Sequence, residues 1–248
     1  MKKIELQIYL PDHAYEFLKE YDCLPKLSGG DLSWVQRQRL STPSVKTIKT
    51  CPGFVRYQQC SLSILNPYNL EYTITEDGQF EYYNEHLFGE SEFTVHPTLQ
   101  FDEFASDMVK RNYISHIIKM NLPFQFKLKE KNTCLTGVAS DPFWNSDKNL
   151  NIDTIPGIFD FNSRFIIGCN IFFAFKNIPG NHTIPAGKIL QNITIPIPVN
   201  KKLVIKYEPV SMNEFMGMKN EQKMAVNFFR TPIKSFYNML KDKKWLNK

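Results

Sequence analysis

Several features that define large classes of protein are missing from this chain of 248 residues. No uninterrupted apolar run approaches the roughly 18 residues that predict a membrane span. In the first ten residues polar and apolar side chains alternate, which predicts a strand and not the apolar core of a signal peptide. We therefore expect a protein that does not enter a membrane.

The cysteines are few and widely spaced in the sequence. There are five of them, an odd number, and no Cys-x-x-Cys pair occurs. This pattern disfavours a disulfide framework or a structural zinc site and favours reduced thiols in a cytosol-like compartment. Cys51 lies two residues after Lys49, which can lower a thiol pKa and make a cysteine nucleophilic. A buried, packed thiol is the more ordinary outcome at Cys51.

Motifs of catalysis are also missing. The chain has no phosphate-binding loop, dinucleotide glycine motif, Gly-x-Ser-x-Gly elbow or His-Glu-x-x-His motif. His86 and His96 lie near Glu85 and Glu92, and a hairpin could bring two imidazoles and a carboxylate around an open metal ion. Isolated histidines in polar segments are usually surface residues, so we assign no metal ligand and expect no cofactor.

Positive charge is absent from residues 57–109, which contain ten acidic residues and no Lys or Arg. Residues 201–248 carry eleven Lys or Arg and four acids, although the whole chain has a net charge of only +5. A basic tail can bind nucleic acid. Because arginines are few, we instead expect the helices from Ser211 onward to lie against the acidic segment, within one subunit or across a homo-oligomer. Nucleic acid is not the expected partner.

The pattern of apolar residues predicts an α+β fold. Period-2 alternation in Ser61–Leu65 and Leu70–Thr75, with a turn at Asp77-Gly78, is typical of antiparallel hairpins. We expect a mostly antiparallel β-sandwich or jelly-roll-like body over residues 1–208, with β structure from residue 45 to about 93. Prolines 196 and 198 favour an edge position for a strand over residues 188–199.

Helices are expected at three places. Residues 12–20 follow Pro11, and residues 101–120 have apolar side chains at three- and four-residue steps before Pro123. Ser211-Met-Asn-Glu214 is a capping box that begins a helix to about Arg230, and Pro232 begins a second one. Residues 209–248 should therefore form a helical hairpin packed on the body.

Aromatic residues in irregular loops indicate a candidate ligand site. Trp34, Phe143 and Trp144 lie in segments rich in Pro, Gly, Ser or Asn, where aromatic side chains either line a pocket or fasten the loop to the core. We expect a cleft on the β body formed by these residues together with Cys51 and Phe54.

An ordered series of short motifs spans residues 24–200. It consists of Leu24-Pro25, Trp34, Lys49-x-Cys51-x-x-Phe54, Pro67-x-Asn69-Leu70, Phe143-Trp144, Pro156-Gly157-Ile158 and Ile184-Pro-Ala-Gly-Lys-Ile-Leu-Gln191. The series resembles an uncharacterised family of small proteins from T4-like cyanophages and other marine phages, with distant bacterial relatives. Asn69 stands where that family more often has Asp. The resemblance implies a phage origin but no activity and no catalytic residues.

Three interpretations of the function stay open, so the sequence does not decide whether the chain is an enzyme. Since no catalytic constellation is visible, the favoured interpretation is a phage accessory protein that binds a ligand or macromolecule without catalysis, in the host cytoplasm or in the virion. One alternative is a metal-dependent enzyme, oxygenase-like or nucleotide- or sugar-modifying, with its site in the mouth of the β body. The other is a structural virion protein.

Overall fold

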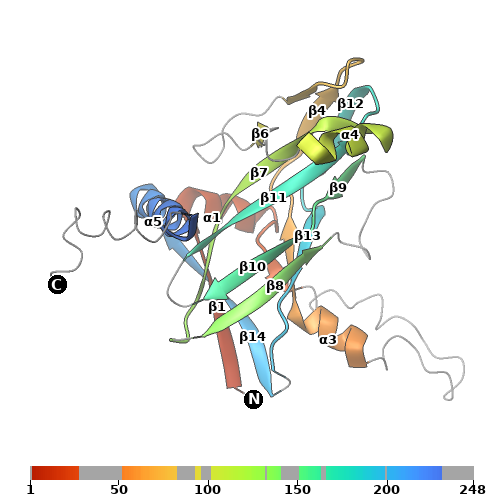
Figure 1. Cartoon of the computed structure of the whole chain (residues 1–248). Helices are drawn as coiled ribbons and strands as arrows, with labels where there is room; N and C mark the ends of the chain where they lie inside the picture. The colour runs from red at the N-terminus through yellow and green to blue at the C-terminus, as the bar shows by residue number, and fades with distance from the viewer. Residues whose placement is uncertain are drawn as a thin grey trace, which may run out of the picture.

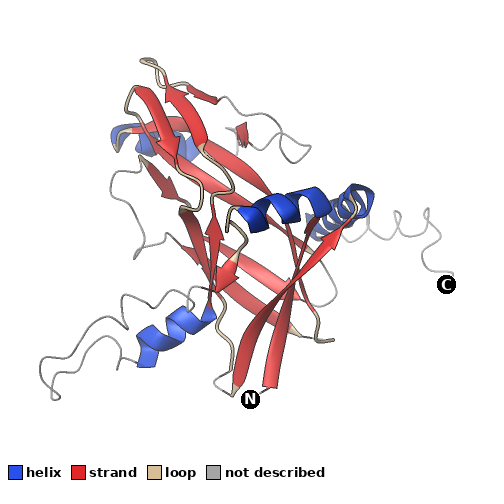
Figure 2. Ribbon diagram, turned by 180° about the vertical axis from the view of Figure 1, so that it is seen from behind, coloured by secondary structure: helices blue, strands red, loops and turns tan. Residues whose placement is uncertain are grey.

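The computed structural model describes residues 2–27, 52–82, 93–95, 102–131, 133–140, 151–162, 166–198 and 200–230. In this part of the chain, mostly antiparallel β-sheets form the body, and a few helices lie around it (Figures 1 and 2). The predicted α+β class with a β-sandwich-like body is confirmed.

The first sheet has six strands. Five of them lie side by side in the order β14, β1, β7, β11 and β9. The sixth strand, β6, pairs with β7 along the same edge of β7 that β1 pairs with further on. β1 and β14 are parallel, whereas the other pairs are antiparallel. The strands are β14 (Lys201–Val210), β1 (Lys2–Pro11), β7 (Tyr113–Leu128), β11 (Ile167–Lys176), β9 (Ile152–Thr154) and β6 (Phe93–Val95).

The second and third sheets are antiparallel throughout. The second contains β10 (Gly157–Asn162), β8 (Cys134–Ser140), β13 (Ile189–Thr194), β3 (Ser61–Leu65) and β2 (Lys26–Leu27), in that order. The third contains β12 (Gly180–Ile184), β4 (Leu70–Ile74) and β5 (Phe80–Tyr82). The core lies between the first two sheets, where the rings of Phe126 on β7 and Phe161 on β10 meet at 5.7 Å.

One buried side chain joins the second sheet to the third. Asn66 lies between β3 and β4, and its Nδ2 donates to the carbonyl oxygens of Tyr68, Ile184 and Pro185 at 2.6–3.1 Å. The backbone of Asn66 adds hydrogen bonds with Lys188 and Gly187. Asn66 therefore joins strand pair β3–β13 to strand pair β4–β12. It lies where the segment from β3 to β4 and the segment from β12 to β13 pass between the two sheets.

The helices cover the ends and one face of the body. α1 (Asp12–Glu20) packs on β1 and β14, and its Tyr15 ring lies 6.2 Å from that of Tyr207. α5 (Met212–Arg230) packs on β1 and β11 through buried Phe215. The predicted capping residue Ser211 accepts a hydrogen bond from the Glu214 backbone N–H. Residues 231–248, where the second helix was expected, lie outside the described residues.

The predicted helix over residues 101–120 is wrong in its second half. α4 runs only from Asp102 to Lys110, and Asn112 follows with a left-handed φ of 63° that ends the helix. β7 then continues through Pro123. This proline lies where the register between β7 and β11 shifts, so its missing N–H interrupts the ladder at an irregularity that already exists.

Two other expectations also fail. α3 (Pro52–Cys60) is a helix in the region expected to be β. β13 ends at Thr194 and lies centrally between β8 and β3, so prolines 196 and 198 follow a central strand instead of marking an edge. Within the described part of one subunit, α5 lies on β1 and β11, away from the acidic strands β4 and β5 (Figures 1 and 2). The expected contact between the C-terminal helices and the acidic segment across a homo-oligomer stays a prediction, and residues 83–92 and 231–248 lie outside the described residues.

Candidate functional site

A cavity of about 450 Å³ lies where the chain passes from β9, at the edge of the first sheet, to β10, at the edge of the second. One wall is β11, the opposite wall is β10, and the inner face of the second sheet closes the back. The lining residues are Ala139, Ile155–Asp160, Ile167, Gly168, Asn170, Phe172 and Gln191. The volume falls within the roughly 300–1,000 Å³ typical of small-molecule sites.

The cavity exists because β9 is much shorter than β11. β9 pairs only with residues 173–175 of β11, and the Ile155 N–H then donates to the Phe172 carbonyl at 2.8 Å. The chain turns away through Pro156-Gly157 and becomes β10. In a β-strand, alternate residues direct their peptide groups toward the same edge of the strand. Gly168, Asn170 and Phe172 are such alternate residues of β11, and all three line the cavity.

Gln191 lines the cavity and carries a buried hydrogen-bond acceptor. Its register opposite Ile64 turns the side chain toward the core, and the register shift between Ile189 and Gln191 leaves Leu190 as an extra residue. Gln191 is only 2% exposed, and its Oε1 atom has no hydrogen-bond partner among the described residues. An unsatisfied buried polar group costs about 1–3 kcal/mol.

The rest of the cavity is apolar inside and polar at its rim. Ile155, Ile167 and Phe172 contribute apolar surface, whereas Asn170 is half-buried and Asp160 is exposed. The carboxylate of Asp160 accepts a long hydrogen bond, 3.4 Å, from the hydroxyl of Thr136. An apolar interior with a few polar groups is the usual composition of a small-ligand site.

A second buried glutamine provides a comparison. Gln125 on β7 is also 2% exposed and also has an Oε1 atom without a partner in the described structure. It lies next to Tyr9 and Gly168 in the register of the first sheet, and it does not line the cavity. Of these two buried glutamines, Gln191 alone lines the cavity.

Tyr113, Asp153 and Lys176 form a polar cluster on three strands of the first sheet. Tyr113 donates a hydrogen bond to Asp153, and Lys176 donates to the Tyr113 hydroxyl and lies 3.2 Å from the Asp153 carboxylate. Burial by itself lowers the pKa of Lys176, but the hydrogen bonds to Tyr113 and Asp153 outweigh it, and the net pKa is raised. The cluster holds β7, β9 and β11 together and keeps Lys176 charged.

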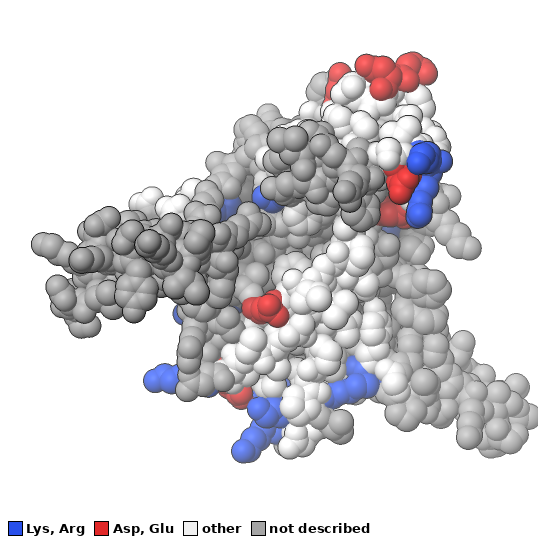
Figure 3. Space-filling model, viewed as in Figure 1, with Lys and Arg blue, Asp and Glu red and all other residues white. Residues whose placement is uncertain are grey.

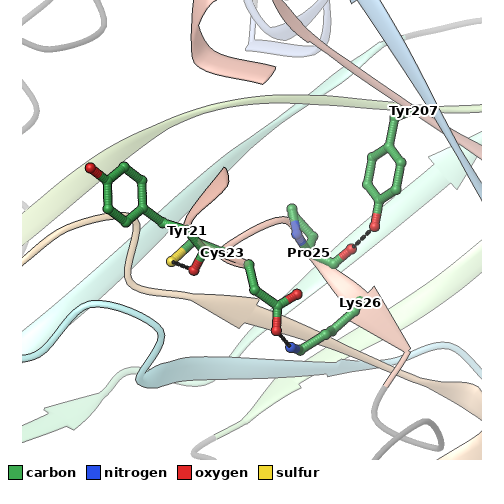
Figure 4. Close-up of polar contacts among 6 residues, drawn as sticks. Tyr21, Cys23, Pro25, Lys26 and Tyr207 are labelled. Carbon is green, nitrogen blue, oxygen red and sulfur yellow. Dashed lines mark hydrogen bonds and ion pairs between the residues drawn. The ribbon is translucent and has the colours of Figure 1, made fainter. Parts of the chain in front are cut away.

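The segment between α1 and β2 carries a buried thiol (Figure 4). Cys23 is buried and donates a hydrogen bond to the Tyr21 carbonyl at 3.2 Å, and burial raises the pKa of its thiol. Tyr207 fixes the same segment through a 2.6 Å hydrogen bond to the Pro25 carbonyl. Since thiolate is the reactive form, Cys23 is inert packing. The described cysteines, at positions 23, 60, 134 and 169, are all free.

The ligand-site residues predicted from the sequence cannot be placed in this site. Trp34, Cys51, Phe143 and Trp144 lie outside the described residues, and so do His86 and His96. Phe54 belongs to α3, but its side chain is not described. Within the described ranges, no group of three or more His, Cys, Asp or Glu residues is arranged to hold a metal ion.

Sequence reasoning missed the residues that line the cavity, although it singled out their neighbourhood. Pro156-Gly157-Ile158 and the block that ends at Gln191 are two of the motifs that carry the family resemblance, and both line the cavity. Ile158 and Gln191 are 33 residues apart in the sequence, and the pairing of β10 with β8 and of β8 with β13 brings them together.

No helix within the described residues is long and apolar enough to cross a membrane. Comparisons of the chain with protein-family models, with curated proteins and with solved structures give no significant match.

Proposed function

We propose that this chain is a non-catalytic binding domain that holds a small ligand in the cavity between its first two sheets. The observation that carries the proposal is the unsatisfied Oε1 atom of Gln191, buried at a cavity of about 450 Å³. A bound N–H or O–H group would satisfy this acceptor and recover the free energy that its burial costs.

The chemistry of the walls defines the ligand class. Apolar side chains from β9–β10 and β11 favour a ligand with an apolar body, and Gln191 requires at least one hydrogen-bond donor on it. The half-buried Asn170, which lines the cavity, offers a further polar contact. A small heteroaromatic or aliphatic molecule with an amide, amine or hydroxyl donor has this combination.

The test is a thermal-shift screen of such small molecules against the full chain, followed by titration of the hits. Gln191→Met removes the acceptor while nearly conserving volume, and it should weaken binding about tenfold or more, the worth of one buried hydrogen bond. Gln125→Met removes the same kind of group from a residue that does not line the cavity, and it should bind like the wild type.

Two outcomes contradict the proposal. If both variants bind every hit as the wild type does, the ligands bind elsewhere. If no hit appears although both variants fold, an ordered water satisfies Gln191 and the cavity is a packing defect.

From the resemblance we further propose that the binding domain is a phage accessory protein that acts in the host cytoplasm or the virion. Mass spectrometry of purified particles separates these locations. A copy number typical of capsid or tail components would replace the accessory role with a structural one.

A further inference from the structure

Seven lysines gather at one end of the first sheet, where β1 and β14 begin and β7 turns into β8. We call this surface the lysine end. Figure 3 shows basic side chains at the bottom of the view, where this end of the sheet lies. It also contains Glu5 and Glu130, so its net charge is +5. The lysines are Lys2, Lys3, Lys127, Lys129, Lys131, Lys201 and Lys202.

The register of the sheet places like charges side by side. β1 and β14 are parallel, and Lys2 lies beside Lys201 and Lys3 beside Lys202. Adjacent like charges on neighbouring strands are destabilising. The two glutamates pair with Lys129 at 3.2 Å and with Lys201 at 3.5 Å. Among the described residues, no ion pair neutralises Lys2, Lys3 or Lys202, so this surface is poised for an anionic partner.

The opposite end of the molecule is acidic. Glu71, Glu76, Asp77 and Glu81 are exposed on β4, β5 and the turn between them, and we call them the acidic tip. Residues 70–82 and 180–184, which form this sheet, contain no Lys or Arg. Figures 1 and 3 place the acidic tip and the lysine end at opposite ends of the body.

We propose that the lysine end binds the acidic tip of a second copy of this chain, head to tail. The complementary surface is present on the molecule itself, with four carboxylates exposed on one narrow hairpin. Nucleic acid fits the lysine end less well. The one arginine beside it, Arg56 of α3, already donates to the carbonyls of Ile197 and Pro198. None of the nine residues that define the lysine end is an aromatic that could stack on bases, and Glu5 and Glu130 would repel phosphates. Because the two surfaces differ, the contact is heterologous and forms open chains or rings.

Sedimentation velocity of the full chain at about 0.03 M and about 0.5 M salt tests the proposal, since added salt screens exposed charges. Oligomers should grow with protein concentration at low salt and dissociate at high salt. Lys3→Glu/Lys202→Glu and Glu76→Lys/Asp77→Lys should each stay monomeric alone. An equimolar mixture of the two should associate again, because each variant keeps one native surface that complements the other.

Lys19→Glu/Lys219→Glu is the matched control, because it changes net charge equally on α1 and α5 and should associate like the wild type. A wild type that stays monomeric at low salt overturns the proposal. So does a mixture that fails to associate while both variants keep the wild-type circular dichroism spectrum. Binding of a single-stranded oligonucleotide that Lys3→Glu/Lys202→Glu abolishes, without self-association, would assign the lysine end to nucleic acid.

Discussion

The side-chain oxygen of Asn69 accepts a hydrogen bond from the backbone N–H of Ala186 at 2.9 Å. This bond joins the Pro67-x-Asn69-Leu70 motif to the Ile184-Pro-Ala-Gly motif, beside the buried Asn66 that also joins them. The position needs an acceptor and not a negative charge. An aspartate at this position would accept the same bond, so the contact is a structural one.

The first prediction concerns this acceptor. Asn69→Asp should leave the free energy of unfolding within about 0.5 kcal/mol of the wild type, whereas Asn69→Leu should lower it by about 1 kcal/mol, the worth of one exposed-side hydrogen bond. Urea denaturation measures both. Equal destabilisation by Asp and Leu would mean that the Nδ2 group, and not Oδ1, is needed at this position.

Gly137 should tolerate no side chain. A Cβ atom there would lie 2.6 Å from the Phe161 ring and 2.8 Å from Ile193 Cγ2 in the core. Gly137→Ala should therefore cost about 1–3 kcal/mol by overpacking. Gly157→Ala is the control, since a Cβ atom at Gly157 meets nothing within 4 Å. If the two variants denature at the same urea concentration, the packing around Phe161 is looser than described.

Removing an unsatisfied buried acceptor should not harm stability. Gln191→Met and Gln125→Met each replace an orphaned amide oxygen with an apolar group, so each should be neutral or raise the free energy of unfolding by up to about 1–2 kcal/mol. Thermal denaturation without ligand measures this. A loss of more than about 2 kcal/mol in either variant would show that its amide is hydrogen-bonded after all.

Tyr207 should make stability depend on alkaline pH. Burial raises the pKa of its hydroxyl from 10.0 to about 12, so the folded state favours the neutral form. This contribution is complete below pH 10 and is lost as pH rises toward 12. Tyr207→Phe should therefore be less stable than the wild type at neutral pH, by about 1 kcal/mol for the lost bond to Pro25. The difference should shrink above pH 10.

The test is to measure the urea midpoints of the wild type and of Tyr207→Phe from about pH 8 to about pH 11.5. This range brackets the ordinary tyrosine pKa of about 10. A difference that stays constant with pH would show that Tyr207 ionises equally in the folded and unfolded states.

The sequence predicted the fold class because strand alternation and hairpin turns are local signals. It failed at residues 111–120 because Ile117 and Ile118, which point to opposite faces of β7, are both buried. When both faces of a strand are buried, its apolar residues no longer alternate with polar ones. Its sequence pattern can then be mistaken for that of a helix. The stop signal was present at Asn112, a residue type that tolerates the left-handed conformation found there.

The cavity could not be predicted from the sequence. Its acceptor depends on one extra residue at Leu190, which sets the direction of Gln191, and its space depends on where β9 stops pairing with β11. Both are properties of strand register between segments far apart in the chain. A glutamine between Leu190 and Asn192 has no local pattern that marks it as a ligand contact.

The central claim, a ligand held at Gln191, is tested most directly by NMR titration of the labelled wild type with a hit from the thermal-shift screen. We predict that the side-chain amide of Gln191 and the backbone amides of Gly157 and Gly168 shift together and saturate with one dissociation constant. The side-chain amide of Gln125 should stay unchanged. Saturable shifts that leave Gln191, Gly157 and Gly168 unmoved would place the ligand elsewhere and contradict the account.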